Sequence, residues 1–354
     1  MPAYKDEKRG TWYARFYYTD WTGKRIETTK RGFDTKKAAK EYEAEAKRTA
    51  GQSPEMTLKS LCDIYLADLK ARRKPTTVYS ETRMIERYIL PHLGDMPLNK
   101  ITVTTIREWQ NTILSMKSMF TGKPLSSHTH RNISVCLSSV LNFGVRFHGL
   151  PSNPCIVARS IGKTRVHIDF WEQEEFKRFL AAVDDEDDKL FFSILLASGM
   201  RVGEFLALAP EDFDFDAGKI SINKTYNWKL KYISSPKTET STRTIAMPKS
   251  IMDGIRHFLT KYYEPPERAF MSTSQRMLTD RLAKYAARAG VKKIRLHDLR
   301  HSHASFLIHH NVPITAISQR LGHKNPKITL EVYSHVYETA DTHIAEILES
   351  VTAF

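Results

Sequence analysis

The sequence predicts an α+β protein that is mainly α, and three observations along its 354 residues predict this class. Aromatic and other residues alternate near the N-terminus, as in a half-buried strand. Apolar residues recur at three- and four-residue spacing through the middle, and short β-branched runs interrupt helical patterns in the second half. We expect a small N-terminal β-sheet plus a helix, an all-α helical domain, and a mixed domain with a small antiparallel sheet.

Residues 1–50 are the first predicted domain. Strands are expected over 11–18 and 24–30, with a turn between them, and a helix from Lys36 onward. A β-ribbon fits the major groove of DNA, whereas a solvated sheet face can carry the same charges without a ligand. The candidate DNA-contacting residues of the ribbon are Arg15, Lys24, Arg25 and Lys30.

Residues 55–150 are the second predicted domain, after a linker at 51–54 that contains Gly and Pro. Apolar stripes predict four short helices, two of them over 76–89 and 102–116, each opened by hydroxyl residues suited to capping. Core packing explains these stripes. The basic connection after the first helix adds three candidate DNA contacts, Arg72, Arg73 and Lys74.

Residues 165–354 are the third predicted domain, after a second linker that begins at Pro151. Its apolar and β-branched patterns predict a mixture of helices and strands. Helices are expected over 171–183, 189–198 and most of the chain from 250 onward, and strands over 214–226, 230–235 and 243–247.

The net charge of +14 is unevenly distributed. Residues 1–50 hold 13 Lys and Arg against 8 Asp and Glu, and residues 51–165 hold 16 against 7. Residues 166–354 hold 25 of each, so the whole excess lies in the first part of the chain. A basic region of this kind favours a polyanionic partner, because each cation at a phosphate releases condensed counterions.

Other features restrict the compartment and the cofactors. The three cysteines, Cys62, Cys136 and Cys155, are an odd set without CxxC spacing, which favours neither disulfides nor a thiolate metal site. No apolar run approaches the roughly 20 residues that span a bilayer. The first residues lack the apolar segment of a secretory signal, so we expect a cytoplasmic protein without a membrane partner.

Four segments of the third domain carry the residue types of phosphoryl-transfer chemistry. They are 198–204 (SGMRVGE), 235–238 (SPKT), 296–301 (LHDLRH) and 321–323 (LGH), and Tyr333 follows ten residues after the last. This order and spacing resembles the tyrosine recombinase (lambda-type integrase) family, and the resemblance covers essentially the whole chain. It implies a DNA strand transferase that works through a 3′-phosphotyrosyl intermediate.

Two arginines suit this chemistry for a physical reason. Transfer of a phosphodiester to a hydroxyl places extra negative charge on the non-bridging oxygens, and permanently charged, bidentate guanidiniums stabilise it. Arg201 and Arg300 are the candidates. The alternative for either arginine is a structural ion pair with a carboxylate, of Glu204 or of Asp298.

The resemblance assigns the remaining roles. His297 and His323 would flank the phosphate, with His297 a general base or hydrogen-bond donor. Lys237 would be the general acid for the leaving 5′-oxygen, although Lys224, Lys229 and Lys231 lie close by. Tyr333 would be the nucleophile, with Tyr337 as its rival. Glu204, three residues after Arg201, can orient that arginine from behind, or it can be an ordinary surface charge.

Two other functions fit part of the sequence: a metal-dependent hydrolase and a non-catalytic DNA-binding regulator. His297 and His301 have the spacing of two zinc ligands on one helical face, as in a metal-dependent hydrolase. Against it, Asp298 replaces the usual glutamate, Arg300 lies between the two histidines, and no third ligand follows at the expected spacing. A non-catalytic DNA-binding regulator would have lost some of the six catalytic positions, whereas each holds the expected type. We therefore expect no metal and no other cofactor.

The resemblance also implies partners. The enzyme would bind double-stranded DNA at core and arm sites, act as a homotetramer, and use an accessory excision factor in some reactions. The domain over 1–50 resembles the arm-type domain of integrases from phages and integrative conjugative elements, which favours integration and excision of a mobile element. An amphipathic helix over 338–351 would pack on its own domain or on a neighbouring subunit.

Overall fold

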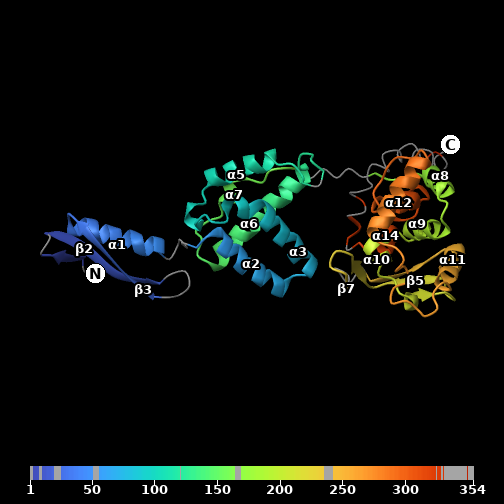
Figure 1. Cartoon of the computed structure of the whole chain (residues 1–354), viewed down its shortest axis with the longest axis horizontal. Coiled ribbons are helices and arrows are strands. Elements are labelled where there is room, and N and C mark those ends of the chain that lie inside the picture. Colours follow the sequence, from blue (N-terminus) through green and yellow to red (C-terminus); the bar gives the residue numbers. More distant parts are fainter. Residues whose placement is uncertain are drawn as a thin grey trace. The chain divides into compact units, whose positions relative to one another are not determined.

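The computed structural model describes residues 3–7, 10–19, 25–50, 56–119, 121–163, 169–234, 242–323, 325–327, 330 and 349 (Figure 1). The chain divides into two compact units, Met1–Val166 and His167–Phe354. The division into three domains remains a prediction. Within the described ranges, no helix has both the length and the apolarity to cross a membrane.

The N-terminal part of the first unit is a three-stranded antiparallel sheet with one helix. The strands follow one another in space and in sequence: β1 (Ala3–Asp6), β2 (Thr11–Thr19) and β3 (Arg25–Phe33). Helix α1 (Lys36–Ala50) covers one sheet face, where Ala39 packs on Ala14 and Phe16. The two expected strands are confirmed by β2 and β3. The sequence did not indicate β1, because four residues are too few for a periodic pattern.

The rest of the first unit is helical, as expected. Its helices are α2 (Leu58–Arg72), α3 (Pro75–Met84), a π-helical stretch (Ile85–Ile89), α4 (Leu90–Leu93), a 3-10 turn (Leu98–Lys100), α5 (Val103–Ser115), α6 (Ser127–Phe147) and α7 (Pro154–Ala158). Hydroxyl side chains cap the longer helices, since those of Thr57, Thr102 and Ser126 accept from backbone N–H groups of the first turn. The helices predicted over 76–89 and 102–116 are confirmed.

The second unit packs seven helices of the described residues with short strands around an aromatic core. The helices are α8 (Gln173–Ala182), α9 (Glu186–Ser198), α10 (Val202–Phe205), α11 (Lys249–Leu259), α12 (Gln275–Arg288), α13 (Asp298–His309) and α14 (Ile314–Leu321), with a 3-10 turn at Pro210–Asp212. The largest buried side chains of the unit are Trp171, Phe179, Phe191, Phe192, Phe205 and Phe270.

The sheet of the second unit corrects one expectation. Three antiparallel strands lie in the order β4 (Phe213–Asp214), β5 (Lys219–Ile222), β8 (Arg243–Ala246), and a separate hairpin joins β6 (Thr225–Asn227) to β7 (Tyr232–Ser234). The single strand predicted over 214–226 is wrong. Asp214 accepts a hydrogen bond from the backbone of Ala217 (2.8 Å), and Gly218 has φ +65°, so a tight turn breaks this stretch.

Candidate active site

The site begins where α9 ends and Arg201 precedes α10. Gly199 ends α9 in the left-handed conformation (φ +62°), and a Cβ there would lie 2.5 Å from a ring carbon of His303. Only glycine satisfies both conditions. Ser198 secures the turn, because its hydroxyl donates to the Ile194 carbonyl (2.6 Å) and accepts from the Met200 N–H (3.2 Å).

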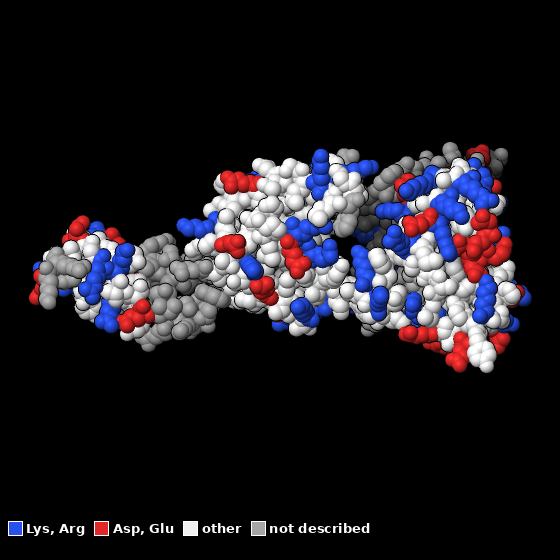
Figure 2. Space-filling model, in the orientation of Figure 1, with Lys and Arg blue, Asp and Glu red and all other residues white. Residues whose placement is uncertain are grey.

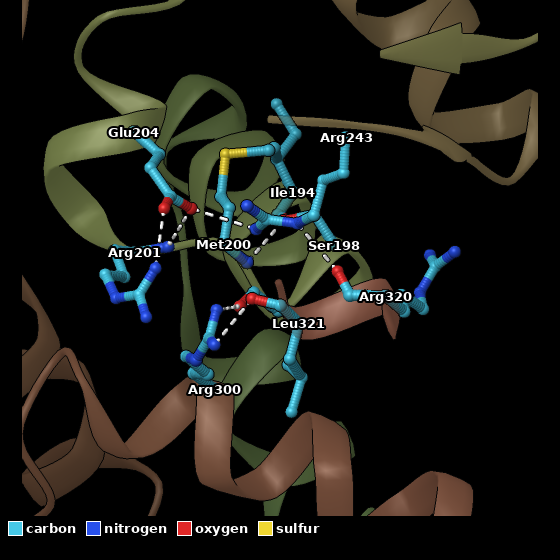
Figure 3. Close-up of polar contacts among 10 residues, drawn as sticks. Ile194, Ser198, Met200, Arg201, Glu204, Arg243, Arg300, Arg320 and Leu321 are labelled. Atoms are coloured by element: carbon cyan, nitrogen blue, oxygen red, sulfur yellow. Dashed lines mark hydrogen bonds and ion pairs between the residues drawn. The ribbon is translucent and has the colours of Figure 1, made fainter. Parts of the chain in front are cut away.

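Arg201 is held from behind by a buried carboxylate (Figure 3). Glu204, 6% exposed, accepts from Arg201 Nη1 at 2.8 Å and from the Arg201 backbone N–H at 3.0 Å. A second arginine, Arg243, donates to the same carboxylate at 2.9 Å. Burial alone would raise the pKa of Glu204, but Arg243 and then Arg201 hold that pKa below its usual value. The carboxylate therefore stays charged, and the Arg201 side chain, 42% exposed, keeps a fixed direction.

Arg300 is held by backbone carbonyls. It is 3% exposed, and its two Nη atoms donate to the carbonyls of Gly199 and Leu321, each at 2.7 Å. These carbonyls end α9 and α14, where the helix dipoles concentrate negative partial charge. Asp298, considered above as a partner, accepts from the backbone N–H of Arg295 at 2.7 Å and from Arg295 Nη2 at 2.7 Å.

His297 and His323 lie in the field of both arginines. His297 directly precedes α13, and His323 follows Gly322, which ends α14 with φ +68°. Burial first, and then the charges of Arg300 and Arg201, together lower the pKa of His323 to about 4. The same three causes lower the pKa of His297. Both imidazoles are therefore neutral at pH 7 in the free protein.

Two more buried or partly buried histidines, His301 and His303, lie close to these residues. The ring of His301 lies 5.2 Å from that of His297, edge to face, and burial followed by His297 lowers the pKa of His301 to about 4. His303, 5% exposed, accepts from Arg320 Nε at 3.3 Å, and burial lowers its pKa to about 3. In the described ranges no three His, Cys, Asp or Glu residues form a group that could hold a metal ion.

Two of the six expected catalytic residues, Lys237 and Tyr333, lie outside the described residues. The structure thus brings together four of them: Arg201, His297, Arg300 and His323. One rival of Lys237 is engaged elsewhere, since Lys224 Nζ lies 2.8 Å from a carboxylate oxygen of Asp212. Tyr337 and the predicted helix over 338–351 also fall outside the description, apart from position 349.

The candidate DNA contacts do not share one face of the N-terminal sheet. Arg15 alternates with the buried Ala14 and Phe16, so it lies on the face opposite α1. Lys30 pairs with Ala14 in register and therefore points to the side of α1. Lys24 and the side chain of Arg25 lie outside the described residues.

In the helical part, the candidate contacts lie between α2 and α3. Arg72 ends α2 with its Nε atom 2.8 Å from Asp68, Arg73 is exposed, and Lys74 is half-buried. On the face drawn in Figure 2, the described residues show basic side chains in both units, with acidic ones between them.

Sequence reasoning missed two arginines, Arg243 and Arg320. Arg243 is the first residue of β8, with its side chain 6% exposed, and Arg320 lies in the last turn of α14. Arg320 donates to the carbonyls of Ala197 (2.9 Å) and Ala246 (3.1 Å). The hint in the sequence is that Arg243 lies two positions before Ile245 in an expected strand, and therefore on the same face as this buried residue.

Comparison of the sequence with known protein families identifies the family to which this site belongs. Residues 169–340 match the Phage integrase family, residues 57–114 match the phage integrase N-terminal SAM-like domain, and residues 2–50 match an arm DNA-binding domain. The chain belongs to the phage integrase family of lambda-type tyrosine recombinases. This integrase-family protein is therefore a DNA-binding, tyrosine-type site-specific recombinase. The matches favour neither the metal-dependent hydrolase nor the non-catalytic regulator.

Individual relatives agree with the family. The integrase-family chain is 29% identical to the ICEBs1 integrase of Bacillus subtilis over 95% of each chain. It is 26% identical to a XerC-like tyrosine recombinase of Caldanaerobacter subterraneus over 84% of each.

Solved structures share the fold at lower identity. The Tn1549 transposon integrase in complex with circular intermediate DNA is 19% identical, with a TM-score of 0.68 over 82% of this chain and 98% of that one. A lambda integrase tetramer bound to a Holliday junction is 19% identical, with a TM-score of 0.58 over 91% of each chain.

Proposed function

We propose that this recombinase integrates and excises a mobile DNA element, and that Tyr333 is its nucleophile. The observation that carries the chemistry is the convergence of Arg201 and Arg300 with two neutral imidazoles, His297 and His323. The match of residues 2–50 to an arm DNA-binding domain and the likeness to the ICEBs1 integrase support the mobile-element role.

In the proposed cleavage step, the Tyr333 oxygen forms a bond to the scissile phosphorus and the bond to the 5′-oxygen breaks. Arg201 and Arg300 stabilise the charge that gathers on the non-bridging oxygens. His323 donates a hydrogen bond to one of them, and neutral His297 accepts the tyrosine proton or donates to the phosphate. Attack of a 5′-hydroxyl on the phosphotyrosine reverses the step. The arginines supply the positive charge, so cleavage should persist in excess EDTA.

A nicked suicide substrate tests the proposed nucleophile. Loss of the short 5′-hydroxyl strand should trap the wild-type protein as a covalent DNA adduct, and the modified peptide should contain Tyr333. Tyr333→Phe should bind DNA and form no adduct, because the ring remains but the attacking oxygen is gone. Tyr337→Phe is the matched control and should react normally. An adduct at any other residue rejects the assignment.

Lys237 is proposed as the general acid that protonates the leaving 5′-oxygen. A bridging 5′-sulfur leaves readily as a thiolate and needs no strong acid. Lys237→Ala should therefore regain most of its lost cleavage rate on the sulfur substrate, whereas Arg300→Ala should not. Equal defects of Lys237→Ala on both substrates would remove this lysine from the acid role.

The proposed DNA contacts follow from charge and exposure. In the sheet, the face opposite α1 combines the exposed Arg15 and Arg31 with Tyr13, and the guanidinium carbon of Arg31 lies 5.4 Å from the Tyr13 ring centroid. We assign this face to arm DNA. We assign Arg72, Arg73 and Lys74, between α2 and α3, to core DNA. Filter binding of each charge-neutralised variant to separate arm and core duplexes tests this division.

The assembly and its setting are also proposals. Recombination of two duplexes requires four cleavages, so we propose a homotetramer on DNA. The lambda integrase tetramer on a Holliday junction supports this arrangement. An accessory factor would bias the enzyme toward excision. Because the substrate is the DNA of the cell, we place the enzyme in the cytoplasm. Light scattering of the protein with and without paired sites measures the oligomer, and a dimeric synaptic complex would contradict it.

A further inference from the structure

Arg243 has no role in the chemistry proposed above, yet it connects both halves of the site. Its side chain, 6% exposed, starts strand β8 and donates in two directions. Arg243 Nη2 donates to Glu204 Oε2 at 2.9 Å, and Arg243 Nε donates to the carbonyl of Arg320 at 2.7 Å (Figure 3).

Through Glu204, Arg243 is connected to Arg201. The carboxylate uses one oxygen for Arg243 and for the Arg201 N–H, and the other for Arg201 Nη1 at 2.8 Å. A carboxylate between two guanidiniums fixes their separation, because each hydrogen bond has a narrow range of length and angle.

Through the backbone of Arg320 and Leu321, Arg243 is connected to Arg300. The next residue in the chain is Leu321, whose carbonyl accepts from Arg300 Nη2 at 2.7 Å. Arg243 therefore holds the last turn of α14 at a carbonyl adjacent to the one that places Arg300. His323 follows two residues later, after Gly322. Movement of this turn would displace both Arg300 and His323.

We propose that Arg243 is a positioning residue that sets the spacing of Arg201 and Arg300 at the scissile phosphate. It acts on Arg201 through Glu204 and on Arg300 through the backbone of Arg320 and Leu321. A planar guanidinium reaches both acceptors at once, whereas a lysine ammonium is a point charge on a flexible stem and holds one of them. The proposal rests on the proposed function, because it assigns both arginines to the phosphate.

The test compares Arg243→Lys with the wild-type protein in single-turnover cleavage of a suicide substrate at saturating DNA. Charge is retained, so we expect DNA affinity within about twofold of wild type, since few phosphate contacts change. The cleavage rate should fall about 100-fold, the scale expected when reacting groups are misplaced by about 1 Å. Arg276→Lys, on the exposed face of α12, is the matched control and should leave both values unchanged.

A second substrate separates positioning from a loss of folded protein. A methylphosphonate at the scissile position carries one negative charge fewer, so its transition state depends less on two correctly spaced cations. The defect of Arg243→Lys should shrink to less than about tenfold on this substrate, because one arginine contact no longer contributes. A reduced folded fraction would slow both substrates by the same factor.

Three results overturn the inference: cleavage by Arg243→Lys at the wild-type rate, an equal loss on both substrates, or a loss confined to DNA affinity. If Arg243→Lys does not fold, Glu204→Gln is measured in the same two assays. This variant weakens the hydrogen bond between Arg243 and Glu204 by removing the negative charge of its acceptor. Failure of the proposed function would look different, since the wild-type protein would then form no adduct at Tyr333.

Discussion

Residues 1–165 and 166–354 use charge in opposite ways. The first region holds the whole excess of +14 and displays its cations on the surface, as with Arg15 and Arg72, whose side chains are 56% and 74% exposed. The second region is balanced and buries its most important charges, with Glu204 at 6% and Arg300 at 3% exposure.

DNA affinity and phosphoryl-transfer chemistry therefore need different electrostatics. An exposed cation attracts DNA over a distance that the salt concentration sets through screening. An ion pair that such a cation makes with a neighbouring carboxylate adds little to the folding free energy. A buried guanidinium held by hydrogen bonds is screened much less and has little freedom to turn, so it meets the phosphate in one orientation. Under the proposed function, the excess of cations lies in the region assigned to DNA binding, whereas the paired, buried ions lie in the region assigned to the reaction.

The largest contrast is expected between Arg300 and Arg72. Arg300→Ala should slow cleavage at saturating DNA by about 10²–10³-fold, the usual cost of one lost donor to a developing charge. Arg72→Ala should weaken binding and leave the cleavage rate of the bound complex unchanged. Single-turnover rates at saturating DNA separate the two effects. Equal losses in the two variants would erase the division of labour.

Stability should follow the same contrast. Glu204→Ala leaves Arg243 buried without its carboxylate, so it should lower the free energy of unfolding by about 3–5 kcal/mol. Glu27→Ala breaks the exposed pair with Arg15 and should leave the unfolding free energy unchanged within measurement error. Urea denaturation of the whole protein measures both. A larger loss for Glu27→Ala would show that the sheet, too, depends on its ion pairs.

Acid should destabilise the second region through its histidines. His303 and His323 have native pKa values of about 3 and about 4, below the usual 6.5. The unfolded chain therefore gains protons first, and stability should fall as the pH drops from 6.5 toward 4.

Histidine variants test this origin. His303→Gln should flatten the dependence of melting temperature on pH over that range, whereas His128→Gln, at an exposed position of α6, should not. A pH dependence identical in wild type and His303→Gln would place its origin elsewhere.

The smallest effect is expected from single cations of the N-terminal sheet. Arg15→Gln should lower the slope of log affinity against log salt by about 0.9 on arm-containing DNA, and not on core DNA. Lys30→Gln is the matched control on the side of α1, and its slope should stay unchanged. A change for Lys30→Gln alone would assign DNA contact to the opposite face.

The fold class could be predicted from the sequence because it depends on local periodicity. Strand β2 and helix α5 each carry enough residues to show their period, and the Thr102 cap of α5 involves only neighbours in sequence. Strand β1 and the breaks between β4, β5 and β6 could not be predicted, since they involve two to four residues whose pairing comes from the neighbouring strands.

The sequence by itself determined the residue types of the site, because Arg201, His297, Arg300 and His323 each lie in a short motif. The sequence could not show which hydrogen-bond partners fix the positions of these side chains. The carbonyls that place Arg300 come from residues 101 and 21 positions away, and the second guanidinium on Glu204 comes from 39 positions away. A backbone carbonyl has no identity in the sequence, and Arg243 resembles any other strand arginine. Only the tertiary structure brings these partners within hydrogen-bonding distance, where burial makes their placement matter.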